Sequence, residues 1–340
     1  MIRLPRFEYR APETIGEAAA LLAEAPGETM LLAGGTDLVP NMKRRQQVPR
    51  VVVGLRNIAS LRQIQNGAGL TIGAGVTLGT LERDERLRAA CPGLYQAVAQ
   101  IATPQLRNMA TIGGNLCLDT RCTYYDQSYE WRKAIDFCMK KDGEICWVAT
   151  SSPRCLAVSS TDAAPMLQAL GATVRLVSAA GERTIEVADL YRNDGMHYLT
   201  RRPDEILTGI VVPDQTGRRS AYWKLRRRGS FDFPVASAAV SARLSPGGEV
   251  EDVRIVLGAV ASRPLASPDA EAGLRGQALT DDRIADAADR AYAIAKPMDN
   301  TDFELVWRKK MVRALVTAAL REIRGDDVAA RRKSLARQVL

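Results

Sequence analysis

The chain has 340 residues, 46% of them hydrophobic, which is enough for one large domain or two to three smaller ones with buried cores. Its net charge is +8, but acidic and basic residues alternate along expected helices such as 81–86, which favours an acidic protein partner over nucleic acid. No apolar run reaches membrane-spanning length, and the opening Met1-Ile2-Arg3-Leu4-Pro5 is not the start of an apolar targeting segment. Together with six cysteines, this predicts a reducing compartment, with the cytoplasm as the expected location.

Residues 1–58 are predicted to form a small α/β unit, the first of two lobes. Thr14 and Glu17 have the spacing of a capping box, and the helix that they begin should end before Pro26-Gly27. Short apolar runs at 30–33 and 51–53 are expected to be buried strands.

Residues 59–217 are predicted to form a second lobe. Its expected elements are strands at 70–72, 173–177 and 206–212 and helices at 78–90, 92–101 and 162–170. Between about 118 and 157 the regular pattern stops. This segment contains four of the six cysteines and is interpreted as an insert.

Residues 218–325 are predicted to form a separate α+β domain. Apolar or alternating runs at 221–226, 235–244 and 253–260 indicate strands, and amphipathic helices are expected near 281–296 and 302–323. Residues 326–340 are charged and are expected to be a frayed tail.

Two glycine turns are candidates for anion binding. Ala33-Gly34-Gly35-Thr36-Asp37 follows an apolar strand, and Thr111-Ile112-Gly113-Gly114-Asn115 repeats its chemistry. Paired glycines let backbone N–H groups converge on a phosphate, although an ordinary tight turn has the same composition. A third segment, 73–79, has GxGxxxG spacing and is not followed by the acidic residue of a Rossmann site.

In these motifs the chain resembles the FAD-binding subunits of the xanthine dehydrogenase and carbon monoxide dehydrogenase family. The likeness extends to Asp162-Ala163-Ala164-Pro165, to Glu205-Ile206-Leu207 and to the strand around Lys224. It implies an α+β fold: a two-lobed FAD-binding domain of the vanillyl-alcohol-oxidase (PCMH) type, then a CO-dehydrogenase-flavoprotein-like C-terminal α+β domain. The implied FAD-binding residues are Leu31, Leu32, Ala33, Gly34, Gly35, Thr36, Asp37, Leu38, Ile101, Thr111, Ile112, Gly113, Gly114, Asn115, Asp162, Leu207 and Lys224.

The resemblance also implies partner chains, namely a molybdopterin-binding large subunit and a [2Fe-2S] small subunit, in a dimer of heterotrimers. Substrate chemistry would then take place on a partner, and no catalytic residue is assigned to this chain. A free-standing flavin oxidase would need its own base, and neither the single His197 nor a carboxylate pair is suited to that role. Covalent attachment of the flavin to histidine is not expected, because the only histidine, His197, lies well outside the glycine turns.

The insert contains Cys122, Cys138, Cys146 and Cys155, separated by 15, 7 and 8 residues. Four thiolates suit either an iron-sulfur cluster or tetrahedral zinc, and the spacing matches no common motif of either kind. An adjacent flavin favours a redox-active [4Fe-4S] cluster, whereas a zinc staple in a basic binding module is the non-redox alternative. Cys91 and Cys117 are expected to be packing residues, with Cys117 the possible replacement ligand.

Such an insert resembles that of the flavin subunits of 4-hydroxybenzoyl-CoA reductases. This resemblance implies that all four insert cysteines bind the cluster and that reduced ferredoxin donates the electrons, for the reductive dehydroxylation of an aromatic thioester. An oxidative molybdenum hydroxylase that delivers electrons outward is the alternative. The sequence identifies neither the organic substrate nor the direction of electron flow.

Overall fold

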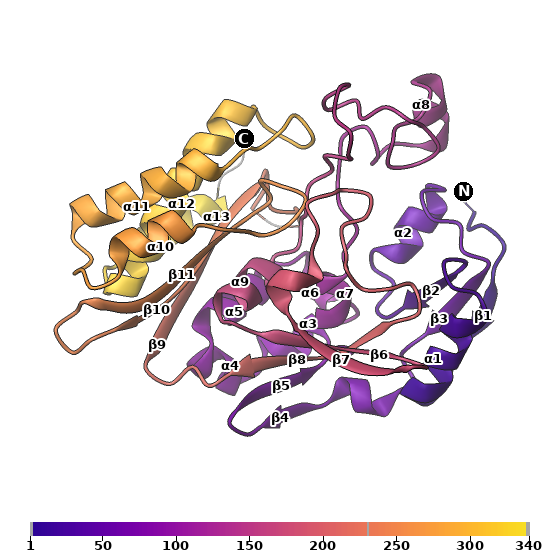
Figure 1. The fold of residues 1–340 in the computed structure, drawn as a ribbon, viewed down its shortest axis with the longest axis horizontal. Helices are drawn as coiled ribbons and strands as arrows, with labels where there is room; N and C mark the ends of the chain where they lie inside the picture. The colour runs from indigo at the N-terminus through magenta and orange to yellow at the C-terminus, as the bar shows by residue number, and fades with distance from the viewer. Residues whose placement is uncertain (1–2, 230, 338–340) are drawn as a thin grey trace.

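The computed structural model describes residues 3–229 and 231–337. Figure 1 shows three sheets, each partly covered by helices. The first is a parallel sheet of order β1-β3-β2, formed by β1 (Glu8–Arg10), β2 (Thr29–Leu32) and β3 (Val51–Gly54). Helix α1 (Ile15–Glu24) begins at Thr14, whose hydroxyl accepts the Glu17 N–H at 3.1 Å, so the predicted cap is present. Helix α2 (Leu38–Lys43) follows β2.

The second sheet is antiparallel, with the strand order β4-β5-β8-β6-β7. Its strands are β4 (Ile64–Asn66), β5 (Gly69–Gly73), β6 (Thr173–Ser178), β7 (Gly181–Glu186) and β8 (Ile206–Pro213). The associated helices are η1 (Ala59–Arg62), α3 (Leu78–Glu82), α4 (Glu85–Ala90), α5 (Pro92–Ala99), α6 (Pro104–Arg107), α7 (Ile112–Leu116), α9 (Ala163–Ala169) and η2 (Val187–Leu190).

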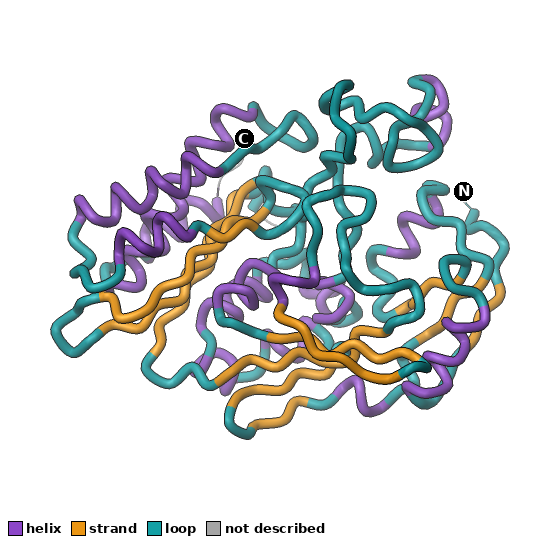
Figure 2. Tube along the Cα trace, viewed as in Figure 1, coloured by secondary structure: helices purple, strands orange, loops and turns teal. Residues whose placement is uncertain are grey.

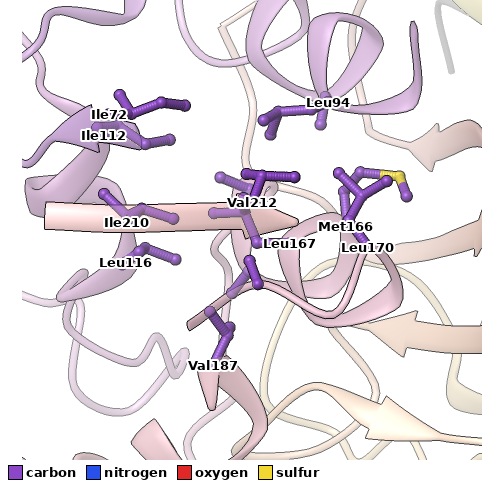
Figure 3. Packing of buried hydrophobic residues seen from close by; sticks show 14 of the residues in the cluster. Ile72, Leu94, Ile112, Leu116, Met166, Leu167, Leu170, Val187, Ile210 and Val212 are labelled. Atoms are coloured by element: carbon purple, nitrogen blue, oxygen red, sulfur yellow. The ribbon is translucent and has the colours of Figure 1, made fainter. Parts of the chain in front are cut away.

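This lobe has a single large core between its sheet and its helices. Figure 3 shows Ile72 and Ile210 of the sheet close to helical side chains such as Ile112 and Leu167, and all four are fully buried. The single helix expected at 78–90 is instead two helices. Asp84 interrupts it because its carboxylate accepts the backbone N–H groups of Arg86 and Leu87 and so begins α4.

The insert at 118–157 consists mainly of loops, as Figure 2 shows, with one short helix, α8 (Tyr129–Ala134). An antiparallel bridge between Arg121 and Val158 closes its base. In Figure 1 the insert rises above the body of the molecule, near α2. Hydrogen bonds hold it there: Arg132 donates to the Arg44 carbonyl at 3.1 Å, and Gln46 donates to the Tyr125 carbonyl.

The third sheet is antiparallel, with the order β12-β11-β10-β9. It is formed by β9 (Arg218–Leu225), β10 (Ala236–Leu244), β11 (Val250–Gly258) and β12 (Leu265–Ala266). Helices α10 (Pro268–Leu274), α11 (Asp281–Ile294) and α12 (Leu305–Arg324) cover one face (Figure 1). Helices α5 and α9 of the second lobe contact the sheet as well. Burial on both faces explains the nearly continuous run of apolar and small residues along β10.

The expectation of a frayed tail after residue 325 is wrong for most of that segment. Helix α13 (Ala329–Arg337) follows α12, and Arg332 lies 4.3 Å from the centre of the Trp223 ring while pairing with Glu322. The tail is therefore docked on β9 through arginine contacts that its charged composition does not reveal. None of the helices in the described part of the chain has both the length and the apolar character needed to cross a membrane.

Candidate functional site

A cavity of about 500 Å³ lies where the two N-terminal lobes meet, and it is called the central cavity below. This volume is in the range of roughly 300–1,000 Å³ that is typical of small-molecule sites. Both predicted glycine turns form parts of its wall. The predicted residues that line it are Leu31, Ala33, Gly34, Gly35, Thr36, Asp37, Leu38, Ile101, Thr111, Gly113, Gly114, Asn115, Asp162 and Leu207.

The first glycine turn connects β2 to α2. Gly35 has a φ of +73°, a left-handed conformation that favours glycine. Gly34 is required for a different reason: a Cβ atom there would lie 2.0 Å from the carbonyl oxygen of Met109. The turn is therefore packed directly against the backbone that precedes the second glycine turn, and the two turns form one continuous wall.

The second glycine turn begins α7. The Thr111 hydroxyl accepts the Gly114 N–H at 3.1 Å and so caps the helix. The Asn115 side-chain oxygen accepts hydrogen bonds from the Thr161 hydroxyl at 2.7 Å and from the Ala163 N–H at 3.2 Å. These bonds fix the Asp162 segment beside the turn, although the two are more than 40 residues apart in the chain.

Three of the predicted residues do not line the central cavity: Leu32, Ile112 and Lys224. Ile112 belongs to the core of the second lobe. Lys224 is buried behind Asp162, and its ammonium group donates to the Asp162 carboxylate and to the Gln100 carbonyl, each at 3.0 Å. Burial lowers the pKa of Lys224 and raises the pKa of Asp162, and the ion pair opposes both shifts. Lys224 thus does not line the cavity itself, and it holds the carboxylate of Asp162, which does.

The four insert cysteines lie around one small cavity, called the cysteine cavity below. Its volume is about 10 Å³, close to the space that one water molecule occupies. Burial raises the pKa of Cys122 to about 12 and that of Cys155 to about 11, so these thiols stay protonated unless a cation binds. Among the described residues, no three cysteine, histidine or carboxylate groups are arranged so that they could hold a single metal ion.

Comparisons with known proteins agree with this arrangement. The family described as the FAD binding domain in molybdopterin dehydrogenase matches residues 5–215, and the CO dehydrogenase flavoprotein C-terminal domain matches residues 220–323. The chain belongs to this FAD-binding family. It is a medium subunit of the molybdenum hydroxylase and CO dehydrogenase type, and the predicted fold class is confirmed.

Similar proteins match over nearly their whole length. The carbon monoxide dehydrogenase medium chain of Afipia carboxidovorans is 31% identical, with 92% of this chain and 95% of that protein covered. The glyceraldehyde dehydrogenase medium chain of Sulfolobus acidocaldarius is 26% identical, with 94% and 99% covered. A solved structure of carbon monoxide dehydrogenase from Hydrogenophaga pseudoflava superposes with a TM-score of 0.77 at 29% identity, covering 94% of this chain and 98% of that one.

For this FAD-binding subunit, sequence reasoning missed several residues of the central cavity wall. Arg121 is buried, pairs with Asp37 of the first glycine turn and with Asp126 at 3.2 Å, and so joins the base of the insert to the turn. The segment 73–79 is no Rossmann site, yet Ala74, Gly75 and Leu78 line the cavity. Other lining residues that were not predicted include Arg44, Asp119, Tyr198, Arg201, Phe231 and Phe233. No motif in the sequence distinguished these residues, which the fold brings to the cavity from separate segments.

The remaining cysteines and the histidine lie apart from the cysteine cavity. Cys91 is buried in the core of the second lobe, where burial raises its pKa to about 11. Cys117 lines the central cavity and not the cysteine cavity. His197 is exposed and does not line the central cavity.

Proposed function

We propose that this chain is the flavin and iron-sulfur subunit of a molybdenum hydroxylase complex, in which the insert adds a [4Fe-4S] cluster to the family's FAD. The observation that supports the cluster is the convergence of Cys122, Cys138, Cys146 and Cys155 on one cavity. FAD is assigned to the central cavity, with its pyrophosphate at the backbone N–H groups of the two glycine turns.

The cysteine cavity suits an iron-sulfur group in its donor set. Four thiolates are the usual ligands of such clusters, and a surrounding apolar shell restricts water. Tyr125, Ala157 and Trp147 pack with the cysteines here. The group would supply one-electron transfer, while the chain provides the ligands and the shell. The small volume of the cavity favours a single zinc ion as the second candidate, which would make the insert purely structural.

The partners and the direction of electron flow are also proposed. Relatives that are medium chains of CO and glyceraldehyde dehydrogenases support a molybdopterin-binding large subunit and a [2Fe-2S] small subunit as partners. The insert supports a complex that resembles 4-hydroxybenzoyl-CoA reductase and takes electrons from ferredoxin. The dehydrogenase names of the relatives favour the alternative, an oxidative complex that delivers electrons outward. A dimer of heterotrimers in the cytoplasm remains the expected setting.

Metal, sulfide and flavin analysis of the anaerobically purified complex tests the proposal. The part of the metal content due to this chain is obtained by comparison with a complex that lacks all four insert cysteines. We expect a difference of about four irons and four sulfides per chain, with FAD equal in both. Zinc in place of that iron would contradict the cluster and establish the structural insert.

The source of electrons is tested by stopped-flow reduction of the assembled complex while flavin absorbance is followed. Reduced ferredoxin should reduce the flavin rapidly, and NADH should be a poor donor because a nicotinamide passes hydride directly to flavin and needs no cluster. A Cys138→Ser variant should lose most of the ferredoxin rate. Rapid reduction by NADH, or an unimpaired variant, would contradict the relay.

The charge on the insert bears on how such a donor would bind. Residues 118–157 contain six basic and six acidic side chains, so the insert is neutral although the chain has a net charge of +8. The basic surface that would attract an acidic ferredoxin therefore lies outside the insert.

A further inference from the structure

One buried lysine lies between the two cavities. Lys140 lines the cysteine cavity, and its ammonium group forms an ion pair of 2.8 Å with Asp119, which lines the central cavity. Both side chains are only 5% exposed. Tyr125 of the cysteine cavity and Tyr198 of the central cavity flank the ammonium, with ring centres at 4.8 and 5.4 Å. The Lys140–Asp119 pair thus forms part of the partition between the two sites.

The hydrogen bonds of Lys140 leave it no spare donor. Besides Asp119, the ammonium donates to the Thr120 hydroxyl at 2.8 Å and to the Gly195 carbonyl at 2.7 Å. An ammonium group has three N–H donors, so all of them are used. Lys140 can therefore act on a group in the cysteine cavity through its charge and not through a hydrogen bond to sulfur.

Three separate segments hold this charge in place. Lys140 belongs to the turn after Cys138, Thr120 to the base of the insert, and Gly195 to the loop that follows η2. The Gly195 N–H also donates to the Cys155 carbonyl at 2.8 Å, and a Cβ atom at Gly195 would lie 2.6 Å from the Ala157 nitrogen. The ammonium of Lys140 is therefore held by hydrogen bonds that join three separate segments of the chain.

We propose that Lys140 is a positioning residue that raises the reduction potential of the group held by the four cysteines. The inference rests on the proposed cluster. Reduction adds one electron from an external one-electron carrier, and no bond to Lys140 forms or breaks. The added negative charge is stabilised by the nearby buried cation, whereas Asp119 opposes this effect from a position that does not line the cysteine cavity.

The test is an anaerobic redox titration of the whole complex, with the cluster followed by EPR spectroscopy and the flavin by absorbance. Lys140→Gln should lower the cluster potential by at least about 59 mV, a tenfold change in a one-electron equilibrium. Lys140→Arg keeps the positive charge and should therefore retain most of the wild-type cluster potential. Asp119→Asn should raise the potential, because the lysine charge is then uncompensated. If the ion pair had only a structural role, the Lys140 and Asp119 variants would not be expected to shift the cluster potential in opposite directions.

The matched control is Lys141→Gln, which removes the same charge at the next residue. Lys141 pairs with Asp142 at 3.2 Å, is about one third exposed and lines neither cavity, so its replacement should leave the potential unchanged. Equal potentials in wild type and Lys140→Gln, or equal shifts in both lysine variants, would overturn the inference. If Lys140→Gln binds no iron, Asp119→Asn decides: an unchanged or lower potential overturns it. If metal analysis finds no iron in the insert of the wild type, that result contradicts the proposed function itself and not the role of Lys140.

Discussion

Replacement of Gly34 with alanine is expected to weaken FAD binding by at least about tenfold, which corresponds to about 1.4 kcal/mol. The added Cβ would lie 2.0 Å from the Met109 oxygen and 2.9 Å from the Ala110 Cα, so the first glycine turn must move away from the second. Overpacking of this kind typically costs about 1–3 kcal/mol. Flavin content after gel filtration and the dissociation constant from fluorescence quenching measure the effect.

Gly67→Ala is the control, because nothing lies within 4 Å of a Cβ atom at that position. It should leave flavin affinity unchanged. Circular dichroism of both variants distinguishes a local loss of the site from unfolding of the chain. Wild-type flavin affinity in the Gly34→Ala protein would show that contact between the two turns is not needed for the site.

Replacement of any one of the four insert cysteines with serine is expected to remove about four irons per chain. If the four cysteines hold the proposed cluster, loss of one ligand should release the cluster as a unit. The variants to compare are Cys122→Ser, Cys138→Ser, Cys146→Ser and Cys155→Ser. Iron and acid-labile sulfide, normalised to FAD, measure the outcome.

Cys91→Ser and Cys117→Ser are the matched controls, since neither residue lines the cysteine cavity. Both should retain the iron of the wild type. Retention of iron in any of the four insert variants would mean that another ligand replaces that cysteine. Loss of iron in Cys117→Ser would identify Cys117 as a ligand, against our assignment.

The sequence by itself determined those features that depend on neighbouring residues. The glycine turns were visible as paired glycines after an apolar run, and the left-handed φ of Gly35 is a local reason for glycine. The lack of room for a side chain at Gly34 comes from the distant Met109 backbone and appears only in the fold. The cap at Thr14 follows from a spacing of three residues. The strands of the third sheet were visible as apolar runs, since burial on both faces removes alternation. Family motifs in the correct order then indicated the fold.

Only the tertiary structure decided how distant segments meet. The family resemblance implied that Lys224 contacts the flavin, but packing places its ammonium group behind Asp162. The cysteine spacings of 15, 7 and 8 residues gave no geometry, and folded loops were needed to bring the four sulfurs around one cavity. The contact of Lys140 with Gly195 spans 55 residues. Contacts over such separations depend on the packing of the whole chain and leave no local periodicity, so the partition between the two cavities could not be read from the sequence.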